Sequence, residues 1–247
     1  MLKEFRADLH IHTCLSPCGS LAMVPGVIVK ETLRKGLDVI GICDHNATEN
    51  VVAVRKAAEK ERIPVLGGME ITSQEEVHIL AFFDNDASLS KMQEIVYDSL
   101  PGTNDERAFG EQVIVNEEDC VVGLNDRLLI GATRLSLEAI VEAIHSLGGL
   151  AIASHIDRES FGIVGQLGFV PEGLALDALE VSPRTSVGNA LAAFPQASGY
   201  PLVTFSDAHY PEDIGNRWTG FLIEDIRTVE MKWALQAQQG RRTFLSE

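Results

Sequence analysis

Basic residues are scarce in this chain. Lys and Arg number 20 against 36 Asp and Glu, which gives the 247 residues a formal net charge of −16. Proteins that bind long nucleic acids neutralise phosphates with clustered Lys and Arg. The composition therefore argues against a long nucleic acid as partner. It leaves room for a small anionic substrate, because bound divalent cations can outweigh the charge of nearby side chains.

Cysteines are few, and the sequence has no long apolar run. Cys14, Cys18, Cys43 and Cys120 form no CxxC pair, which favours reduced thiols over disulfides. No apolar run reaches ~18 residues, and residues 1–6 lack the apolar stretch of a signal peptide. We therefore expect a cytoplasmic protein without membrane contact. No pattern in the sequence indicates an oligomeric state.

Short apolar runs alternate with segments of helical spacing through most of the chain. Beyond a first strand at 8–12, strands are predicted at 38–43, 65–71, 77–83, 150–154, 178–181, 202–205 and 220–223. Helices are predicted at 27–37, 50–62, 135–147, 187–193 and 229–239. Strands with helices between them indicate a parallel α/β sheet, either open or closed into a barrel.

Residues 84–133 depart from this alternation. A predicted helix at 88–100 leads into a polar stretch, and two predicted strands at 112–116 and 127–130 follow as a hairpin. Nothing in this region is long or apolar enough for a separate core. We therefore expect residues 1–247 to form one domain with an insertion around 84–133.

The first strand carries two histidines one residue apart. Side chains on a strand alternate between its faces, so His10 and His12 should point to one side and Leu9 and Ile11 to the other. Two imidazoles directed at one place can begin a metal site. Taken alone, the pair fits ordinary strand histidines equally well.

Other polar residues decide between these interpretations. Six of the seven histidines lie in a predicted strand or at its carboxyl end, where parallel α/β folds build their sites. The candidates beyond His10 and His12 are Asp44, His45, Glu70, His78, His155, Asp207 and His209. Any one of these histidines alone would be more simply explained as structural. His145 lies on a predicted helix, and we interpret it as structural. Burying so many imidazoles and carboxylates together is costly without a cation, so their joint placement favours metal binding.

The ligand types suggest which metals to expect. Imidazole with carboxylate fits Zn, Mn or Fe better than Ca or Mg. The number of ligands exceeds what one ion can coordinate, so two or three divalent ions are expected, with Glu70 as a bridge. Neighbouring metals suit displacement at phosphorus.

Five motifs in order resemble those of the PHP family, named after polymerase and histidinol phosphatase. They are Asp-Leu-His-Ile-His at 8–12, Cys-Asp-His-Asn at 43–46, Gly-Met-Glu at 68–70, Ser-His at 154–155 and Ser-Asp-Ala-His at 206–209. The resemblance covers nearly the whole chain and implies a distorted (β/α)7-type barrel with a phosphoesterase site of two or three metals. It implies that His10, His12, Glu70 and Asp207 hold a first ion. By the same resemblance, Glu70 and His78 contribute to a second ion, and His45, His155 and His209 hold a third.

One loop departs from the family pattern. Members commonly have Ser-Asp-Gly after the first histidines, and its Asp ligates the second ion. Here the loop reads Ser16-Pro17-Cys18-Gly19. Cys18 either replaces that Asp as a thiolate ligand or is a bystander thiol.

Phosphoryl transfer also needs positive groups beside the non-bridging oxygens. Arg158 lies three residues beyond His155 on the same predicted loop, so we expect it to act as a catalytic phosphate clamp. The alternative is a surface arginine paired with Asp157 or Glu159. Arg184, beyond another strand end, is a second candidate for substrate binding.

These features favour a metal-dependent phosphoesterase that hydrolyses a small phosphate ester with metal-activated water. One alternative is an amidohydrolase-like enzyme, whose barrel usually carries a metal-bridging lysine at a later strand end. This interpretation is weakened because the candidate lysines all fall on predicted helices. They are Lys30, Lys35, Lys56, Lys60, Lys91 and Lys232. The other alternative is a non-catalytic domain that binds metal and acts through a partner.

Overall fold

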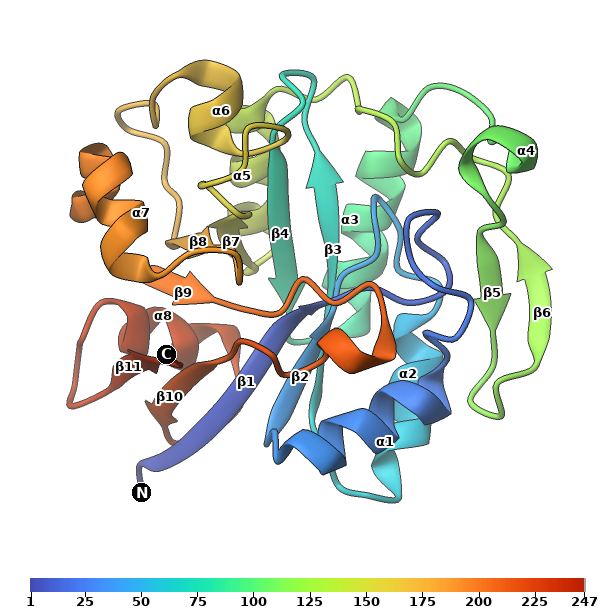
Figure 1. The fold of residues 1–247 in the computed structure, drawn as a ribbon, viewed down its shortest axis with the longest axis horizontal. Helices are drawn as coiled ribbons and strands as arrows, with labels where there is room; N and C mark the ends of the chain where they lie inside the picture. Colours follow the sequence, from blue (N-terminus) through green and yellow to red (C-terminus); the bar gives the residue numbers. More distant parts are fainter. Residues whose placement is uncertain (247) are drawn as a thin grey trace.

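The structure is a computed structural model that describes residues 1–246 (Figure 1). Its strands are β1 Lys3–Ile11, β2 Val39–Ile42, β3 Val65–Thr72, β4 His78–Phe83, β5 Val113–Val115, β6 Val121–Leu124, β7 Leu150–Ala153, β8 Ala178–Val181, β9 Leu202–Thr204, β10 Thr219–Ile223 and β11 Arg242–Leu245. Its helices are α1 Pro25–Lys35, α2 Val51–Glu59, α3 Asp86–Ser99, α4 Glu106–Phe109, α5 Leu137–Ser146, α6 Ile163–Leu167, α7 Val187–Ala193 and α8 Thr228–Leu235, with 3₁₀ turns at Pro195–Gly199 and Pro211–Asp213. Across residues 1–246, no helix is long and apolar enough to cross a membrane.

Seven strands form a nearly closed barrel in the order β1-β2-β3-β4-β7-β8-β9. The chain just after β9 returns to β1, where the Ala208 carbonyl accepts from the His12 N–H and the Ala208 N–H donates to the His10 carbonyl, both at 3.0 Å. The first half of β1 instead pairs antiparallel with β10, which pairs with β11 outside the barrel. This arrangement confirms the predicted distorted barrel.

Strand β4 runs against its neighbours. It pairs antiparallel with both β3 and β7, so the expectation of a parallel sheet throughout was wrong here. The reason is the short connection from β3, because a parallel pairing needs a crossover of a dozen or more residues. The reversal brings the first residue of β4, His78, to the edge where the parallel strands end. The sequence pattern had placed His78 in or at the carboxyl end of its strand.

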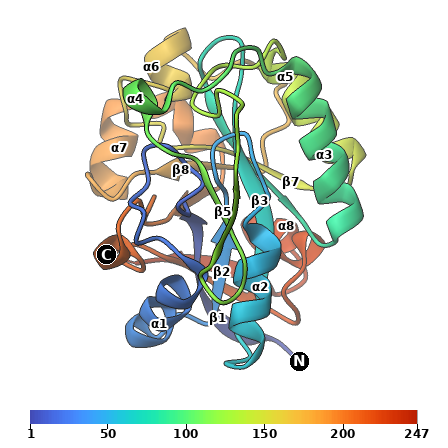
Figure 2. The same ribbon diagram turned by 90° about the vertical axis from the view of Figure 1, so that its right-hand side faces the viewer.

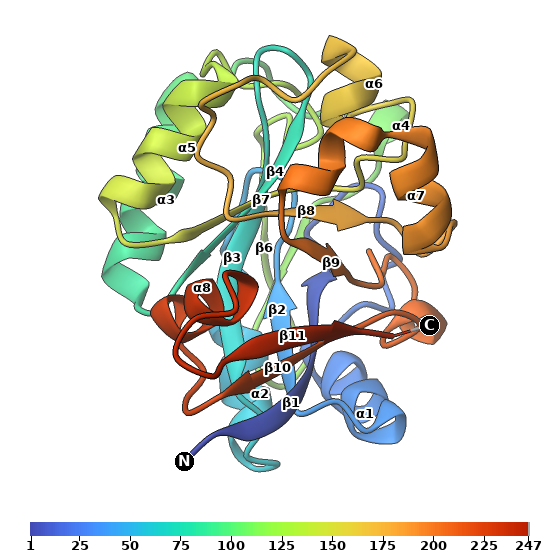
Figure 3. The same ribbon diagram turned by 90° about the vertical axis from the view of Figure 1, so that its left-hand side faces the viewer.

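Apolar side chains pack on both faces of the barrel wall. The outer cluster joins helices α1, α2, α3 and α5 to the strands and includes Val54 and Ile79. The inner cluster fills the barrel and continues to α8, with Leu80, Phe82 and Met231 among its members. Figure 3 shows α8 beside β10 and β11, at the end of the barrel near the N-terminus.

A bulge in β1 changes the expected alternation of its side chains. The register of β1 against β2 shifts between Asp8 and Ile11. Leu9 belongs to the inner cluster and Ile11 to the outer one, so the prediction that they share a face was wrong. A bulge adds one residue to a strand and so reverses the faces beyond it. His10 and His12 nevertheless reach the same site.

Within residues 84–133, α3 forms as predicted, and β5 and β6 form a separate two-stranded sheet. The second strand of this hairpin is Val121–Leu124 rather than 127–130, because the chain already turns between Asn116 and Cys120. The hairpin lies against the loop after β1 and the start of α2 (Figure 2), where Asn50 bonds to the backbone of Val113 and Val115 at 3.0 Å. One domain with an insertion stays a prediction.

The structure corrects the sequence pattern elsewhere too. Helix α8 ends at Leu235, earlier than the predicted 239, and α4, α6 and β11 were not predicted. These elements are short, and a few residues show too little periodicity to reveal an element.

Candidate metal centre

Glu70, in β3, lies at the centre of a group of imidazoles. Its carboxylate oxygens lie between 2.9 and 3.5 Å from ring nitrogens of five histidines: His10, His12, His45, His78 and His155. His10 lies in β1 and His78 in β4, whereas His12, His45 and His155 lie in the segments that follow β1, β2 and β7. The edge of the barrel thus brings together residues up to 145 positions apart, from His10 to His155.

Asp207, in the segment after β9, completes this cluster on its outer side. Its Oδ1 lies 3.3 Å from His10 Nε2, 3.4 Å from His12 Nε2 and 3.5 Å from His209 Nδ1. Its Oδ2 accepts a hydrogen bond from Arg158 Nη2. All eight predicted ligands therefore gather in one place, although their binding of ions stays a prediction.

Several atoms of the cluster have no hydrogen-bond partner among residues 1–246, although each is buried. They are His10 Nε2, His12 Nε2, His45 Nδ1, Glu70 Oε1 and His78 Nδ1. A buried polar atom without a partner costs about 1–3 kcal/mol, so such a concentration calls for a ligand. The atoms are the imidazole and carboxylate donors that Zn, Mn and Fe accept. The site therefore fits divalent metal ions.

The charge states of Glu70, Asp207 and His12 also suit cations. Burial opposes a charge on both carboxylates, but His78 and His10 hold the pKa of Glu70 well below its usual range, and His10 lowers that of Asp207. Burial lowers the pKa of His12 to about 4, so this imidazole is neutral at pH 7. Ionised carboxylates and neutral imidazoles are the forms that ligate metals.

The ligand atoms fall into three overlapping groups. Within each group, the potential ligand atoms all lie within 4.8 Å of one another. The groups are His10 with His12 and Glu70; His45 with Glu70 and His78; and His12 with His45 and His209. The first two resemble the sets expected for the first and second ions. His45 and His209 were expected beside His155 at a third ion, but they are grouped with His12 instead. His155 Nε2 lies 3.3 Å from Glu70 Oε1. The division of ligands among ions stays a prediction.

Asp44 supports the cluster from behind. Its carboxylate accepts hydrogen bonds from the Thr13 amide, the Thr13 hydroxyl and the Ser16 hydroxyl at 2.6 to 2.7 Å. Ser16 Oγ in turn lies 3.0 Å from His12 Nδ1. Burial raises the pKa of Asp44 to about 6. These contacts fix the loop after β1 and the orientation of the His12 ring.

Glu180, in β8, is a residue of the site that the sequence reasoning missed. It is fully buried, and its two oxygens lie 2.9 and 3.0 Å from His10 Nδ1. Glu180 Oε2 also accepts from the His155 amide at 3.0 Å. Burial favours the neutral form of His10, but Glu180 raises the pKa of this imidazole well above its usual value. The available signal was a single acidic residue within the apolar strand Ala-Leu-Glu-Val.

We expect Glu180→Gln to weaken metal binding. A carboxylate behind a ligating imidazole fixes its orientation and raises its basicity, and losing such a partner typically costs about 10–100-fold in metal affinity. Titration of the metal-free protein with Zn²⁺ against a competing chelator would measure this. Glu172→Gln, an exposed glutamate on the preceding loop, is the matched control. An unchanged dissociation constant in Glu180→Gln would show that Glu180 does not support His10.

Cys18 lies at the edge of the cluster. Its Sγ is 3.1 Å from His209 Nε2, beside the group formed by His12, His45 and His209. Burial, followed by the carboxylates of Glu70 and Asp207, raises the pKa of the thiol to about 12. Both alternatives for Cys18 stay open: the contact with His209 favours a thiolate ligand, and the raised pKa of the thiol favours a bystander.

The backbone is strained where two of the ligands follow their strands. His155 has φ 27° and Asp207 has φ 50°. Non-glycine residues adopt positive φ rarely, and such residues concentrate at functional sites. In both cases the left-handed conformation turns a side chain from the strand end into the cluster.

Two arginines line the approach to the cluster. Arg158, on the loop after β7, is bonded to Asp207, while Asp157 accepts instead from the Ser182 amide and hydroxyl at 2.7 and 2.6 Å. Arg184 follows β8. Both line a cleft of about 460 Å³ that also exposes Asp207, His209 and Cys18. The structure thus places Arg158 at the cluster, not in the expected alternative pairing with Asp157 or Glu159.

Comparison with known proteins identifies the family. Residues 8–159, more than half of the chain, match the PHP domain. The chain belongs to the PHP family. PHP-family proteins are metal-dependent hydrolases, and PHP domains bind divalent metals, which agrees with the clusters described above. The predicted family and the predicted barrel are therefore both confirmed.

Three similar proteins show how much of other chains this one spans. The uncharacterized protein YqxK of Bacillus subtilis is 23% identical over 98% of this chain and 64% of its own length. The lesion-specific endonuclease PfuEndoQ of Pyrococcus furiosus superposes with a TM-score of 0.70 and 18% identity, over 98% of this chain and 58% of its own. A putative metal-dependent phosphoesterase of Bifidobacterium adolescentis superposes with a TM-score of 0.54 and 20% identity, over 83% and 88%. The chain thus spans about three fifths of the first two proteins.

One prediction from composition was wrong. The expected exclusion of a long nucleic acid fails, because endonuclease Q, whose fold this PHP chain shares, acts on DNA with a lesion. A second endonuclease Q structure, in complex with a 27-mer duplex substrate with an abasic lesion at the active site, superposes with a TM-score of 0.65 and 18% identity over 97% of this chain and 58% of its own. Net charge averages over a whole surface, so it does not describe the few groups that meet a substrate.

Proposed function

We propose that this chain is a metal-dependent phosphoesterase that hydrolyses a small phosphate ester. The position of Arg158 carries the proposal. Its Nη2 bonds to Asp207 at the rim of the cluster, while its Nε is buried with no hydrogen-bond partner among residues 1–246. A phosphoryl oxygen beside Asp207 would supply that partner, because guanidinium groups bind such oxygens in a fork.

The residues divide the chemistry among them. Divalent ions bound by the cluster would polarise the phosphoryl oxygens and lower the pKa of the attacking water. Arg158 binds a non-bridging oxygen and stabilises the charge that develops on it. Asp207 holds Arg158 in place with one oxygen and faces the histidines with the other. Arg184 brings a second positive charge to the same cleft.

A panel of phosphomonoesters and short phosphodiesters, tested with Mn²⁺ and Zn²⁺, examines this proposal. We expect turnover that depends on added metal, stops with a chelator and is lost in His10→Ala, because His10 reaches both Glu70 and Asp207. Circular dichroism would show whether the variant is folded. Bound metal with no turnover of any ester would favour the non-catalytic alternative. If amide substrates are added to the panel and are the only compounds turned over, the result would favour the amidohydrolase-like alternative.

A nucleic acid substrate is the second candidate, favoured by the similarity to endonuclease Q over nearly the whole of this chain. The same assay therefore includes duplex oligonucleotides with and without an abasic site. Cleavage of the lesion duplex with no turnover of small esters would favour this second candidate over the first.

A further inference from the structure

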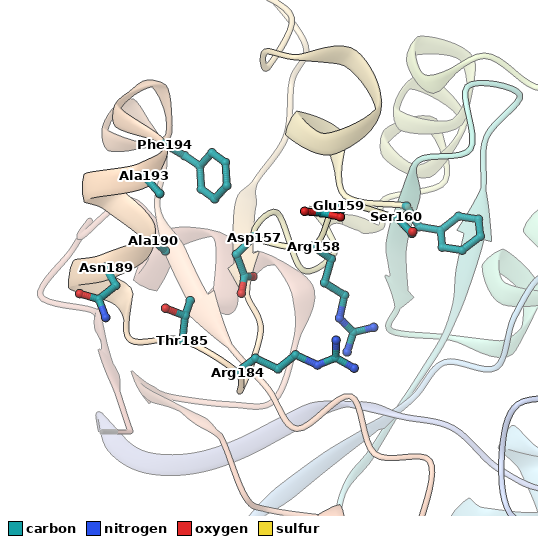
Figure 4. A pocket seen from close by; sticks show the side chains of 11 residues that line it. Asp157, Arg158, Glu159, Ser160, Arg184, Thr185, Asn189, Ala190, Ala193 and Phe194 are labelled. Atoms are coloured by element: carbon teal, nitrogen blue, oxygen red, sulfur yellow. The ribbon is translucent and has the colours of Figure 1, made fainter.

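A second, larger cleft adjoins the one that exposes Asp207. It has a volume of about 700 Å³ and lies between the loop after β7, the loop after β8 and helix α7 (Figure 4). Arg158 and Arg184 line both clefts. The two arginines therefore stand at the junction, with the imidazole–carboxylate cluster on one side and the larger cleft on the other.

The junction offers guanidinium nitrogens that the nearby carboxylates do not occupy. Asp157 and Glu159 line the larger cleft, but both oxygens of Asp157 accept from Ser182, and Glu159 has no salt-bridge partner within residues 1–246. Arg184 has no salt-bridge partner within residues 1–246, and Arg158 pairs with Asp207 through one nitrogen only. A phosphate held by these two arginines would have one side toward the cluster and the other toward the larger cleft.

The far wall of the larger cleft differs in character. Phe194 directs its ring toward the cleft. Ala190 and Ala193 on α7 add small apolar side chains to the same wall (Figure 4). Asn189, exposed on the same helix, adds an amide that both donates and accepts hydrogen bonds. An aromatic ring at one end of this wall and an amide at the other suit a flat ligand with polar edges, which can stack on the ring and hydrogen-bond to the amide.

We propose that this cleft binds the leaving group of the substrate, and that the leaving group carries a flat heterocyclic ring. The inference rests on the proposed function, since the phosphate at the arginines fixes where the alcohol half must go. The volume lies within the roughly 300–1,000 Å³ typical of small-molecule sites. The ring could belong to a free nucleotide or to one residue of a strand, and both present the same chemistry to the cleft.

The decisive comparison uses two substrates that differ only in the ring. A nucleoside 5′-monophosphate and ribose 5-phosphate contain the same phosphate ester. We expect kcat/KM to favour the nucleotide by about 10–100-fold, the range that stacking of one base supplies. A 5′-phosphorylated dinucleotide in a third arm distinguishes the sources, because a strand-specific cleft would favour it over the mononucleotide.

A matched pair of variants on α7 tests the location. Ala193 lines the cleft, whereas its neighbour Ala192 is exposed and does not. We expect Ala193→Trp to bring the ratio of the two kcat/KM values toward one and Ala192→Trp to leave it unchanged. A ratio near one in the native protein, or equal ratios in the two variants, would overturn the proposal while leaving the phosphoesterase intact.

A binding measurement separates this proposal from the proposed function. Calorimetry on the metal-loaded protein would compare adenosine 5′-monophosphate with ribose 5-phosphate, with no hydrolysis required. We expect the nucleotide to bind at least about 10-fold more tightly and Ala193→Trp to remove the difference. If no ester is hydrolysed but this difference is found, the phosphoesterase proposal fails and the ring site stands. Equal affinities would reject the ring site.

Discussion

Glu70→Gln is expected to lose bound metal and nearly all hydrolytic activity. Glutamine keeps the shape of the side chain, but its neutral amide cannot bridge cations among five imidazoles. The oxygens of Glu70 lie close to ring nitrogens of five histidines of the cluster, all except His209. We expect kcat/KM to fall by at least about 10³-fold, equivalent to about 4 kcal/mol of transition-state stabilisation. Elemental analysis of the purified protein should find at least one ion fewer per chain.

The control for this prediction is the same substitution at an exposed position. Glu61 lies in the turn before β3 and is exposed, so Glu61→Gln should keep both metal content and activity. Retention of the full metal content and activity by Glu70→Gln would mean that Glu70 is not the bridge. Loss of activity with full metal content would restrict its role to positioning the histidines.

Most of the barrel could be predicted, because its strands are short apolar runs between helices of clear periodicity. Helix α7 and strand β8 were predicted with their observed bounds. The direction of β4 was missed because side-chain alternation is the same in either direction. The short connection between the predicted strands at 65–71 and 77–83 was the signal that could have revealed it. The bulge in β1 was also hidden, because it arises from pairing with β2 rather than from local residue types.

The site likewise divides into residues that the sequence reveals and contacts that only the fold reveals. The gathering of its eight predicted ligands could be anticipated because polar residues at the ends of apolar strands are conspicuous, and one edge of the barrel collects them; their binding of ions stays a prediction. Glu180 was missed since it lies within β8 rather than beyond its end, and its partner His10 is 170 residues away. The contact of Arg158 with Asp207 likewise joins two loops whose spacing only the closed barrel determines.

The grouping of ligands was the least accessible part. Motif order assigned His45, His155 and His209 to a common ion, whereas side-chain geometry groups the first and last with His12. His12 and His209 have ring centroids 4.2 Å apart, because the bulged end of β1 lies against the segment after β9. Such proximity depends on how the barrel closes, which no local pattern encodes.

Arg158→Ala is expected to reduce kcat/KM by about 10²–10³-fold, the usual effect of removing one preorganised donor from developing charge. Steady-state kinetics on the best ester of the panel would measure it, with inhibition by inorganic phosphate as a second readout. We expect both to weaken in parallel, since Arg158 binds the phosphoryl group in substrate and product alike. Metal content should stay unchanged, because Arg158 bonds to Asp207 Oδ2 while Oδ1 faces the histidines.

Arg158→Lys sharpens the interpretation. A lysine ammonium keeps the charge but lacks the planar fork, so it cannot hold Asp207 with one nitrogen and present others to a phosphate oxygen at fixed angles. We therefore expect only partial recovery relative to Arg158→Ala. Arg34→Ala, which removes an exposed arginine paired with Glu31 on α1, should change neither readout. Full activity in Arg158→Ala, with unaltered phosphate inhibition, would leave the buried Nε without a functional explanation and would transfer the role of phosphate clamp to Arg184, the other arginine that both clefts share.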